Sequence, residues 1–319
     1  MIKILANDGI STSGINLLKK QGFDITTKHV PQNDLINIIN KENYEVLLVR
    51  SATNVRRELI DACPKLKTIG RGGVGMDNID VDYARNKGIN VINTPAASSF
   101  SVAELVFAHL FGMVRFLFES NRKMPLTGDS DFKELKRNYA EGRELSGKTL
   151  GIIGFGRIGQ EVAKRAIGLG MKIIAHDKFI QEADIKLKFF NGVTKSFRIK
   201  TESLNKTLEE SDFITLHVPK NGKKPVIGAE QIGIMKTGAG IINTSRGGLI
   251  DETALMFALD KEKLAYAGLD VFENEPNPSI HICMHNAISL TPHIGAATLE
   301  AQDRIGTELA NQIITQFRR

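Results

Sequence analysis

The chain is poor in cysteine and contains no long apolar run. Only Cys63 and Cys283 are cysteines among its 319 residues, and no Cys-x-x-Cys or Cys/His metal spacing accompanies them. We therefore expect free thiols and no structural metal. No apolar run reaches the ~18 residues that a membrane-spanning helix needs, and the first residues, "MIKILANDGI", lack the features of a signal peptide. These absences predict a cytoplasmic protein without a membrane partner.

The composition predicts a globular protein of more than one domain. Hydrophobic residues make up 42% of the chain and charged residues 24%, which allows a large core, and the length favours about two domains. The formal net charge of +6 comes from basic residues that are mostly scattered along the chain. That pattern is weak support for nucleic-acid binding and suits a protein that attracts small anionic substrates equally well.

Two series of alternating strand-like and helix-like segments indicate an α/β fold. The first series covers about ninety residues and includes "EVLLVRS" and "INVINTP"; the second begins near Leu145 and includes "DFITLHV" and "AISLTPH". Strands that alternate with helices indicate parallel pairing. Residues 300–317 predict a terminal helix, whereas the basic, poorly periodic segment 178–206 predicts a loop with at most a short strand.

The segment between the two series predicts a buried helix. Residues 101–118 are apolar around almost the whole helical circumference, so we expect this helix to lie between domains or against another subunit. Ser101 and Glu104 have the spacing of a capping box at its start.

A glycine-rich segment indicates a dinucleotide site. In "LGIIGFGRIGQEVAKRAIGLGMKIIAHD", Gly154, Gly156 and Gly159 form G-x-G-x-x-G between a strand and a helix. Such glycines allow a tight turn, a close approach to a pyrophosphate and close helix packing, and the helix N-terminus favours the anion. Asp177, after the next strand, is placed to bind the adenosine ribose and disfavours NADP, although Lys178 weakens that preference. The alternative is a turn without a ligand.

Three polar residues that follow strand-like runs suggest a catalytic site. Because ligands of open α/β sheets bind beyond the carboxyl ends of the strands, Arg246, Glu275 and His293 should approach the glycine loop. Arg246 can bind a carboxylate through two parallel hydrogen bonds. His293 can exchange a proton near neutral pH, and Glu275 can orient its ring. Taken singly, they could be a salt-bridging arginine, a turn glutamate and a structural histidine.

The chain resembles the D-isomer-specific 2-hydroxyacid dehydrogenase family from about residue 45 to its end. Matching stretches include "IGRGGVGMDNIDVDYARNKGINVINTP", "LSGKTLGIIGFGRIGQEVAKR", "INTSRGGLIDETAL", "GLDVFENEP" and "TPHIGAATLEAQ". Within that family the chain is most similar to the phosphoglycerate dehydrogenases. The resemblance implies two Rossmann-like or flavodoxin-like domains. Residues 1–95 and 291–319 would form the substrate-binding domain, residues 96–290 the inserted NAD-binding Rossmann domain, and hinges would lie near 93–98 and 285–293.

The resemblance also assigns roles to individual residues. Arg246, Glu275 and His293 would be catalytic, and Asp270 would hold the nicotinamide carboxamide. The implied cofactor contacts are Val74, Gly154, Gly156, Arg157, Ile158, Gly159, Asp177, Val218, Thr244, Asp270 and Gly295. The implied substrate contacts are Arg50, Ser51, Ala52, Arg71, Gly73, Val74 and Arg137, the last across a dimer interface. Simple turns and surface arginines are the alternatives at these substrate positions.

The leading functional hypothesis is NAD-dependent oxidation of 3-phospho-D-glycerate to 3-phosphohydroxypyruvate, the entry step of serine biosynthesis, by a homodimer or homotetramer. Ser98 stands where the phosphoglycerate enzymes carry asparagine, and we expect no C-terminal serine-sensing domain. A hydroxypyruvate or glyoxylate reductase would use the same three catalytic residues. A dinucleotide-sensing scaffold of the corepressor type is a third hypothesis, but nothing in the sequence suggests disordered tails. Glu275 disfavours a formate dehydrogenase, which carries glutamine there.

Overall fold

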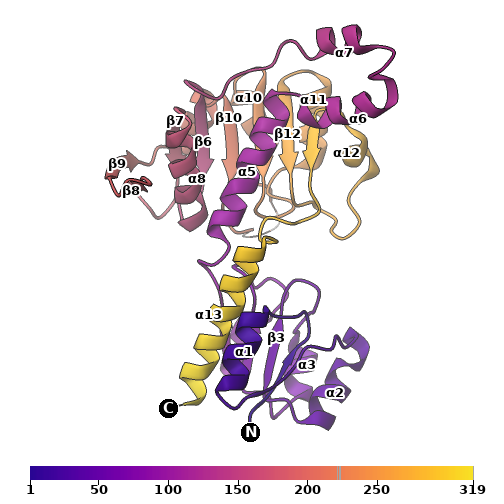
Figure 1. The fold of residues 1–319 in the computed structure, drawn as a ribbon, viewed down its shortest axis with the longest axis vertical. Helices are drawn as coiled ribbons and strands as arrows, with labels where there is room; N and C mark the ends of the chain where they lie inside the picture. Colours follow the sequence, from indigo (N-terminus) through magenta and orange to yellow (C-terminus); the bar gives the residue numbers. More distant parts are fainter. Residues whose placement is uncertain (221, 223, 319) are drawn as a thin grey trace. The chain divides into compact units, whose positions relative to one another are not determined.

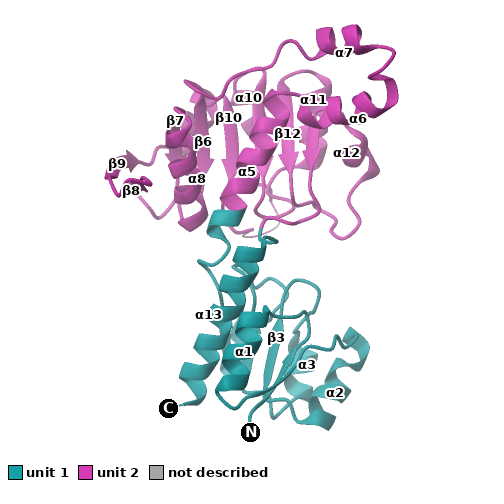
Figure 2. Ribbon diagram, in the orientation of Figure 1, with its two compact units in different colours: residues 1–101, 296–319 teal, residues 102–295 magenta. Residues whose placement is uncertain are grey.

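The computed structural model divides the chain into two α/β units, and it describes residues 1–220, 222 and 224–318 (Figures 1 and 2). Unit 1 consists of Met1–Ser101 and Ala296–Arg319, and unit 2 of Val102–Gly295. The unit boundaries in the structure are 101/102 and 295/296, a few residues later along the chain than the boundaries that we expected, 95/96 and 290/291. Unit 1 is therefore built from both ends of the sequence, and unit 2 from its middle.

Unit 1 contains a five-stranded parallel sheet in the order β2-β1-β3-β4-β5. Its strands are β1 (Lys3–Ala6), β2 (Asp24–Thr26), β3 (Val46–Val49), β4 (Thr68–Arg71) and β5 (Asn90–Asn93). The connecting elements are α1 (Thr12–Lys20), η1 (Gln32–Asp34), α2 (Leu35–Glu42), α3 (Arg57–Ala62) and α4 (Val81–Asn86), and α13 (Leu299–Phe317) returns to this unit. This strand order is that of flavodoxin-like folds.

Helices cover both faces of this sheet because its strands are apolar on both sides. Leu5 faces one core, whereas Ile4 and Ala6 face the other core, which α1 and α13 cover. The two helices pack closely, since a Cβ on Gly14 would lie 2.7 Å from the carbonyl oxygen of Gly306. Two glycines thus allow the end of the chain to complete unit 1.

Unit 2 contains a six-stranded parallel sheet in the order β13-β12-β11-β10-β6-β7. Its strands are β6 (Thr149–Ile153), β7 (Lys172–His176), β10 (Phe213–Leu216), β11 (Ala239–Asn243), β12 (Leu264–Leu269) and β13 (Ile288–Leu290). The helices between them are α8 (Arg157–Gly168), α9 (Leu204–Glu210), α10 (Ala229–Ile234), α11 (Glu252–Asp260) and α12 (Ile280–Met284). The strand order reverses between β6 and β10, which is where such sheets bind ligands. The predicted α/β fold class is confirmed.

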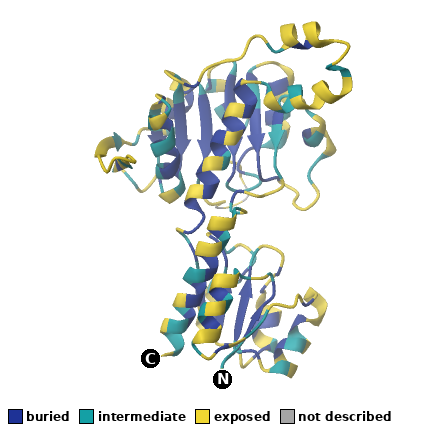
Figure 3. Ribbon diagram, viewed as in Figure 1, coloured by how far each residue is buried: buried dark blue, intermediate teal, exposed yellow. Residues whose placement is uncertain are grey.

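The apolar helix α5 (Ser99–Val114) belongs largely to the core of unit 2 (Figure 3). It begins at Ser99, so Ser101 is its third residue and the predicted capping box at its start is wrong. The helices α6 (Leu117–Thr127) and α7 (Phe132–Asn138) follow it. No single helix among the described residues is long and apolar enough to cross a membrane; α5 and α6 meet that criterion only as a pair bent by 56°.

The segment 178–206, which we predicted as a loop with at most a short strand, contains a β-hairpin instead. The strands β8 (Glu182–Lys188) and β9 (Thr194–Lys200) pair antiparallel, with Gly192 at the turn in a positive-φ conformation (φ 83°). Alternate residues face inward, and Ile185 is buried in the core of unit 2. The alternating apolar residues around an Asn-Gly turn are a hairpin signal that the high lysine content obscured.

Candidate active site

The glycine loop joins β6 to α8 at the point where the strand order reverses. Gly154 has φ 95°, and a Cβ there would lie 2.5 Å from the carbonyl oxygen of His217. A Cβ on Gly159 would lie 2.1 Å from the carbonyl oxygen of Gly154, whereas nothing lies within 4 Å of a Cβ on Gly156. The fold therefore requires the first and third glycines, while the second borders open space at the N-terminus of α8.

A pocket of about 500 Å³ opens beside this loop. It lies within unit 2 and is lined by residues that follow β6, β7 and β10, among them Gly154, Gly156, Asp177, His217 and Val218. Its size is typical of a small-molecule or cofactor site. The structure thus brings together four of the predicted cofactor residues, and Arg157 and Ile158 form the adjacent first turn of α8.

Asp177 is held firmly at the edge of this pocket. One carboxylate oxygen accepts the Phe155 amide at 2.7 Å, and the other accepts the amides of Phe179 at 2.8 Å and Ile180 at 3.0 Å. Burial raises the pKa of Asp177, but these hydrogen bonds outweigh it and hold the pKa below its usual range. Because a carboxylate offers about four lone-pair sites, the ionised side chain still has capacity to accept a ribose hydroxyl.

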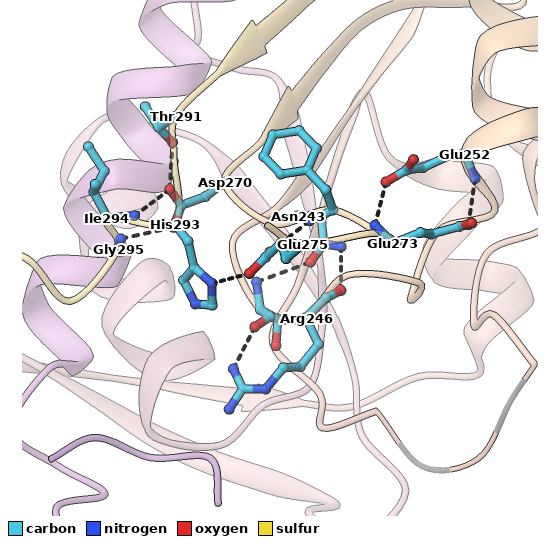
Figure 4. A network of polar contacts seen from close by, with 12 residues as sticks. Asn243, Arg246, Glu252, Asp270, Glu273, Glu275, Thr291, His293, Ile294 and Gly295 are labelled. Atoms are coloured by element: carbon cyan, nitrogen blue, oxygen red, sulfur yellow. Dashed lines mark hydrogen bonds and ion pairs between the residues drawn. The ribbon is translucent and has the colours of Figure 1, made fainter. Parts of the chain in front are cut away.

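His293 and Glu275 form a hydrogen-bonded pair, shown in Figure 4. The distance from His293 Nδ1 to Glu275 Oε2 is 2.7 Å, and Glu275 Oε1 accepts the Phe272 amide at 2.9 Å. The two side chains are 40% and 35% exposed, so solutes can reach them. Since Glu275 engages Nδ1, the ring presents Nε2 for proton exchange with a bound molecule.

Asp270 fixes the backbone on both sides of His293. It directly follows β12 and is completely buried. Its Oδ1 accepts the Thr291 hydroxyl at 2.6 Å and the Ile294 amide at 2.8 Å, and its Oδ2 accepts the Gly295 amide at 2.8 Å. Burial raises the pKa of Asp270, although these hydrogen bonds oppose the shift. His293 itself has φ 55°, which costs about 1–2 kcal/mol for a residue with a Cβ, and the contacts to Asp270 stabilise that conformation.

Arg246 lies in the loop after β11, close to the other two predicted catalytic residues (Figure 4). Its Nη1 donates to the Ser245 carbonyl oxygen at 2.6 Å, and its own carbonyl oxygen accepts from Asn243 Nδ2 at 2.8 Å. A Cβ on Gly247 would lie 1.7 Å from the carbonyl oxygen of Phe272, so the loop packs tightly against the segment that leads to Glu275. The structure therefore brings all three predicted catalytic residues to the carboxyl ends of neighbouring strands.

Comparison with known proteins assigns the family. The model of the D-isomer specific 2-hydroxyacid dehydrogenase NAD-binding domain matches residues 107–295. The chain is also 42% identical to hydroxypyruvate reductase of Thermotoga maritima, over 99% of this chain and 98% of that protein. The chain belongs to the D-isomer-specific 2-hydroxyacid dehydrogenase family.

Other similar proteins carry the name phosphoglycerate dehydrogenase. The dehydrogenase is 42% identical to D-3-phosphoglycerate dehydrogenase of Methanocaldococcus jannaschii over 98% of its own length, but it spans only 57% of that protein. The crystal structure of NAD⁺-bound 3-phosphoglycerate dehydrogenase of Entamoeba histolytica matches with a TM-score of 0.77 and 30% identity, over 100% of this chain and 96% of that one. These matches are members of the same family, and the cofactor of the chain is NAD.

Unit 2 of the dehydrogenase fits NAD. Gly156 leaves open space at a helix N-terminus, and Asp177 lines the same pocket with a carboxylate. Thr244, a predicted contact, is buried, and its Oγ1 makes no hydrogen bond to any residue that the structure describes. A buried hydroxyl without a partner is uncommon, and a bound cofactor would supply one.

The predicted substrate residues of unit 1 lie on two loops. Asp8 Oδ2 accepts the Arg50 amide at 2.6 Å and the Thr53 amide at 3.1 Å, which leaves Ser51 and Ala52 exposed between these two anchored residues. On the second loop, the Arg71 guanidinium lies over Gly73, which has φ 145°, and Arg50 lies beside Gly72. Val74 is 39% exposed. Arg137, in contrast, is exposed on α7 of unit 2.

Sequence reasoning missed two residues that shape these sites. Asp8 anchors the 50–53 loop, and only its position two residues after β1 could have indicated it. His217 is partly buried at the cofactor pocket, where burial lowers its pKa to about 3 and keeps the ring neutral. It directly precedes the predicted contact Val218, at the end of β10, and that position was the available signal.

Proposed function

We propose that this dehydrogenase oxidises 3-phospho-D-glycerate to 3-phosphohydroxypyruvate with NAD. The observation that carries the reaction class is the Glu275–His293 pair beside Arg246 in the NAD-binding unit of a 2-hydroxyacid dehydrogenase. Such a pair can move a proton to and from an oxygen atom, and an arginine can hold the carboxylate next to that oxygen.

The proposed mechanism assigns one task to each residue. Arg246 binds the substrate carboxylate through parallel hydrogen bonds and thereby orients C2. His293 Nε2 takes the proton of the C2 hydroxyl, and Glu275 stabilises the resulting imidazolium. NAD⁺, held beside the glycine loop and Asp177, would supply the hydride acceptor for C2, so the products would be the 2-keto acid, NADH and a proton. In the reverse direction His293 returns the proton to the carbonyl oxygen.

Two arginines of unit 1 support a phosphorylated substrate. Arg50 and Arg71 flank the Gly72–Gly73 turn, and guanidinium groups bind phosphate in a bidentate manner. We propose that they bind the substrate anions together with the backbone amides of Ser51, Ala52, Gly73 and Val74, and that Arg137 contributes from a second subunit. We also propose that the remaining predicted cofactor residues contact NAD. The homodimer or homotetramer stays a prediction, which light scattering would check.

Hydroxypyruvate is the second candidate substrate. The Thermotoga maritima relative is named for this substrate and is as similar in sequence as the phosphoglycerate dehydrogenase of Methanocaldococcus jannaschii. An unphosphorylated acid would use the same three catalytic residues but would need fewer cationic partners in unit 1.

A substrate panel with matched variants tests the proposal. We expect NADH formation from 3-phosphoglycerate, and we expect Arg71→Ala to raise KM for 3-phosphoglycerate at least about tenfold, since a charge-assisted hydrogen bond contributes about 1.5–3 kcal/mol. The control Arg85→Ala, an exposed residue of α4, should leave that KM unchanged.

Faster turnover of hydroxypyruvate or glyoxylate with NADH, without any turnover of 3-phosphoglycerate, would overturn the substrate assignment. Tight NADH binding with no turnover of any 2-hydroxy or 2-keto acid would instead favour a dinucleotide-sensing scaffold.

A further inference from the structure

We infer that His109 is a positioning residue for the catalytic loop of this enzyme. Its imidazole lies on α5, far from His293 in sequence, and it reaches the loop through Thr291 and Asp270. The inference rests on the proposed role of His293 as the proton carrier, and it adds a residue outside the catalytic trio that fixes where His293 stands.

His109 makes two side-chain contacts to the strand that leads into the loop. It is 2% exposed, its Nδ1 lies 2.8 Å from Ser289 Oγ, and its Nε2 lies 3.1 Å from Thr291 Oγ1. Ser289 belongs to β13, and Thr291 follows that strand immediately. One side chain of α5 therefore engages the chain two and four residues before His293.

The hydrogen bonds of Asp270 determine the directions in this chain of contacts. Both of its oxygens accept backbone amides, and the Thr291 hydroxyl donates its single proton to Oδ1 at 2.6 Å. Thr291 Oγ1 must then accept from His109, which requires a proton on Nε2. Burial lowers the pKa of His109 to about 4, so the ring is neutral and its bare Nδ1 accepts from Ser289.

A glycine makes room for this imidazole against the sheet. Gly268 of β12 pairs with Ser289 of β13, and a Cβ on Gly268 would lie 3.0 Å from His109 Cβ and 3.1 Å from its Cγ. Those distances are shorter than about nine in ten contacts that real Cβ atoms make. The absence of a side chain at Gly268 is therefore what lets the ring reach the level of Ser289 and Thr291.

The same contacts hold the strained backbone of His293. Thr291, Ile294 and Gly295 all donate to Asp270, while His293 between them has φ 55°. If the Thr291 hydroxyl loses its donor from His109, it can rotate or shift, and the loop relaxes toward ordinary backbone angles. A displacement of about 1 Å at a catalytic group can cost about 10²-fold in rate.

Three variants test the inference at fixed protein concentration and pH. His109→Leu keeps the apolar bulk but removes both hydrogen bonds, and we expect kcat to fall by about 10-fold to 10²-fold with little change in the Kd for NADH. His109→Gln can donate to Thr291 and accept from Ser289, so it should recover most of the loss. Val106→Ala, a buried residue of the same helix, is the control for destabilisation alone and should leave kcat of the folded protein unchanged.

A double-mutant cycle with His293→Ala separates positioning from mere folding. Rates are measured with 3-phosphoglycerate and NAD, and with hydroxypyruvate or glyoxylate and NADH, and the fastest of these reactions is used. Since His109 acts through His293, His109→Leu should cause no further loss in the His293→Ala background. If His109→Leu fails to fold, Thr291→Val, which keeps the side-chain shape, replaces it in the cycle with the same expected result.

The outcomes distinguish this inference from the proposed function. An equal loss of kcat in both backgrounds, a loss with Val106→Ala as large as that with His109→Leu, or no rescue by His109→Gln would overturn the positioning role. Full activity of His293→Ala would instead remove His293 from the mechanism, and the proposed function with it.

Discussion

Gly156→Ala, Gly159→Ala and Gly168→Ala each add one methyl group to α8 or its N-cap, and the structure predicts three different results. A Cβ on Gly159 would lie 2.1 Å from the carbonyl oxygen of Gly154, whereas real Cβ contacts are essentially never under 3.0 Å. The difference, 3.0 − 2.1 Å, is about 0.9 Å that the glycine loop or α8 must yield. Because both atoms belong to rigid backbone, we expect Gly159→Ala to lose about 1–3 kcal/mol of unfolding free energy.

Gly156→Ala should behave in the opposite way. Nothing lies within 4 Å of its Cβ, and its φ of −72° suits any residue, so stability should change by less than about 0.5 kcal/mol. The methyl group would, however, occupy the space through which the backbone approaches the pyrophosphate. We expect the Kd for NADH to rise at least about tenfold, which corresponds to about 1.4 kcal/mol.

Gly168→Ala is the matched control in the last turn of the same helix. Its Cβ also meets nothing within 4 Å, and replacing a helical glycine by alanine stabilises a helix by about 0.5–1 kcal/mol. NADH binding should not change. Urea unfolding without cofactor gives the stability differences, and NADH fluorescence titration gives the affinities. Wild-type affinity of Gly156→Ala would refute the assignment of this loop to the pyrophosphate, and wild-type stability of Gly159→Ala would refute the packing argument.

Three further predictions concern the catalytic pair and the buried His109. His293→Ala should lower kcat by roughly 10² or more in steady-state assays while NADH titration shows unchanged binding; loss of both would indicate a structural role. Glu275→Gln should also lower kcat, by about 10-fold or more, because Glu275 accepts from the Phe272 amide with one oxygen and from His293 Nδ1 with the other, whereas glutamine has only one acceptor oxygen; a wild-type rate would contradict this. Burial lowers the folded-state pKa of His109 from 6.5 to about 4, so the unfolded chain binds the proton first and stability falls as the pH drops through that window. Relative to His109→Gln, the wild type should lose up to about 3 kcal/mol of unfolding free energy between pH 7 and pH 4. Urea unfolding at several pH values measures this loss. Parallel plots of unfolding free energy against pH for the two proteins would contradict the lowered pKa of His109.

Much of the fold could be predicted because each unit repeats a strand and a helix with clear boundaries. The glycine loop was predictable for a local reason: its turn, its helix and the strand before it are contiguous in sequence. The hairpin of β8 and β9 was not, since lysines interrupt its inward-facing residues and only Ile185 is deeply buried. The start of α5 was also misplaced, because Ser101 has the sequence of a cap but lies inside the helix.

The sequence predicted a site residue only where its role could be inferred from its place at the end of a single strand. Arg246, Glu275 and His293 could be proposed because each follows an apolar run. The contacts of Asp8 and His109 could not be predicted, because their partners at Arg50 and Thr291 lie far away in the sequence. Such contacts depend on which elements become neighbours in space, and periodicity contains no information on that.

Three aspartates at strand ends accept hydrogen bonds from loop backbone amides that would otherwise have no partner. Asp8, Asp177 and Asp270 lie one or two residues after β1, β7 and β12, and each accepts two or more backbone amides from loops that carry predicted functional residues. Loops at the carboxyl ends of parallel strands leave amides without partners, and one carboxylate, an acceptor with about four lone-pair sites, can satisfy several of them.

The donor arrangement at Asp270 limits what else this carboxylate can do. Its Oδ1 already accepts from Thr291 and Ile294, whereas Oδ2 accepts from Gly295. With about two lone-pair sites on each oxygen, Oδ1 is saturated and any further donor has to reach Oδ2. The predicted contact to the nicotinamide carboxamide must therefore be made through Oδ2, next to Gly295. A larger residue at Gly295 would crowd that oxygen, since a Cβ there would lie 3.1 Å from Oδ2. The glycine and the carboxylate thus have to be retained together, because the loop that presents His293 and the proposed carboxamide contact share a single oxygen atom.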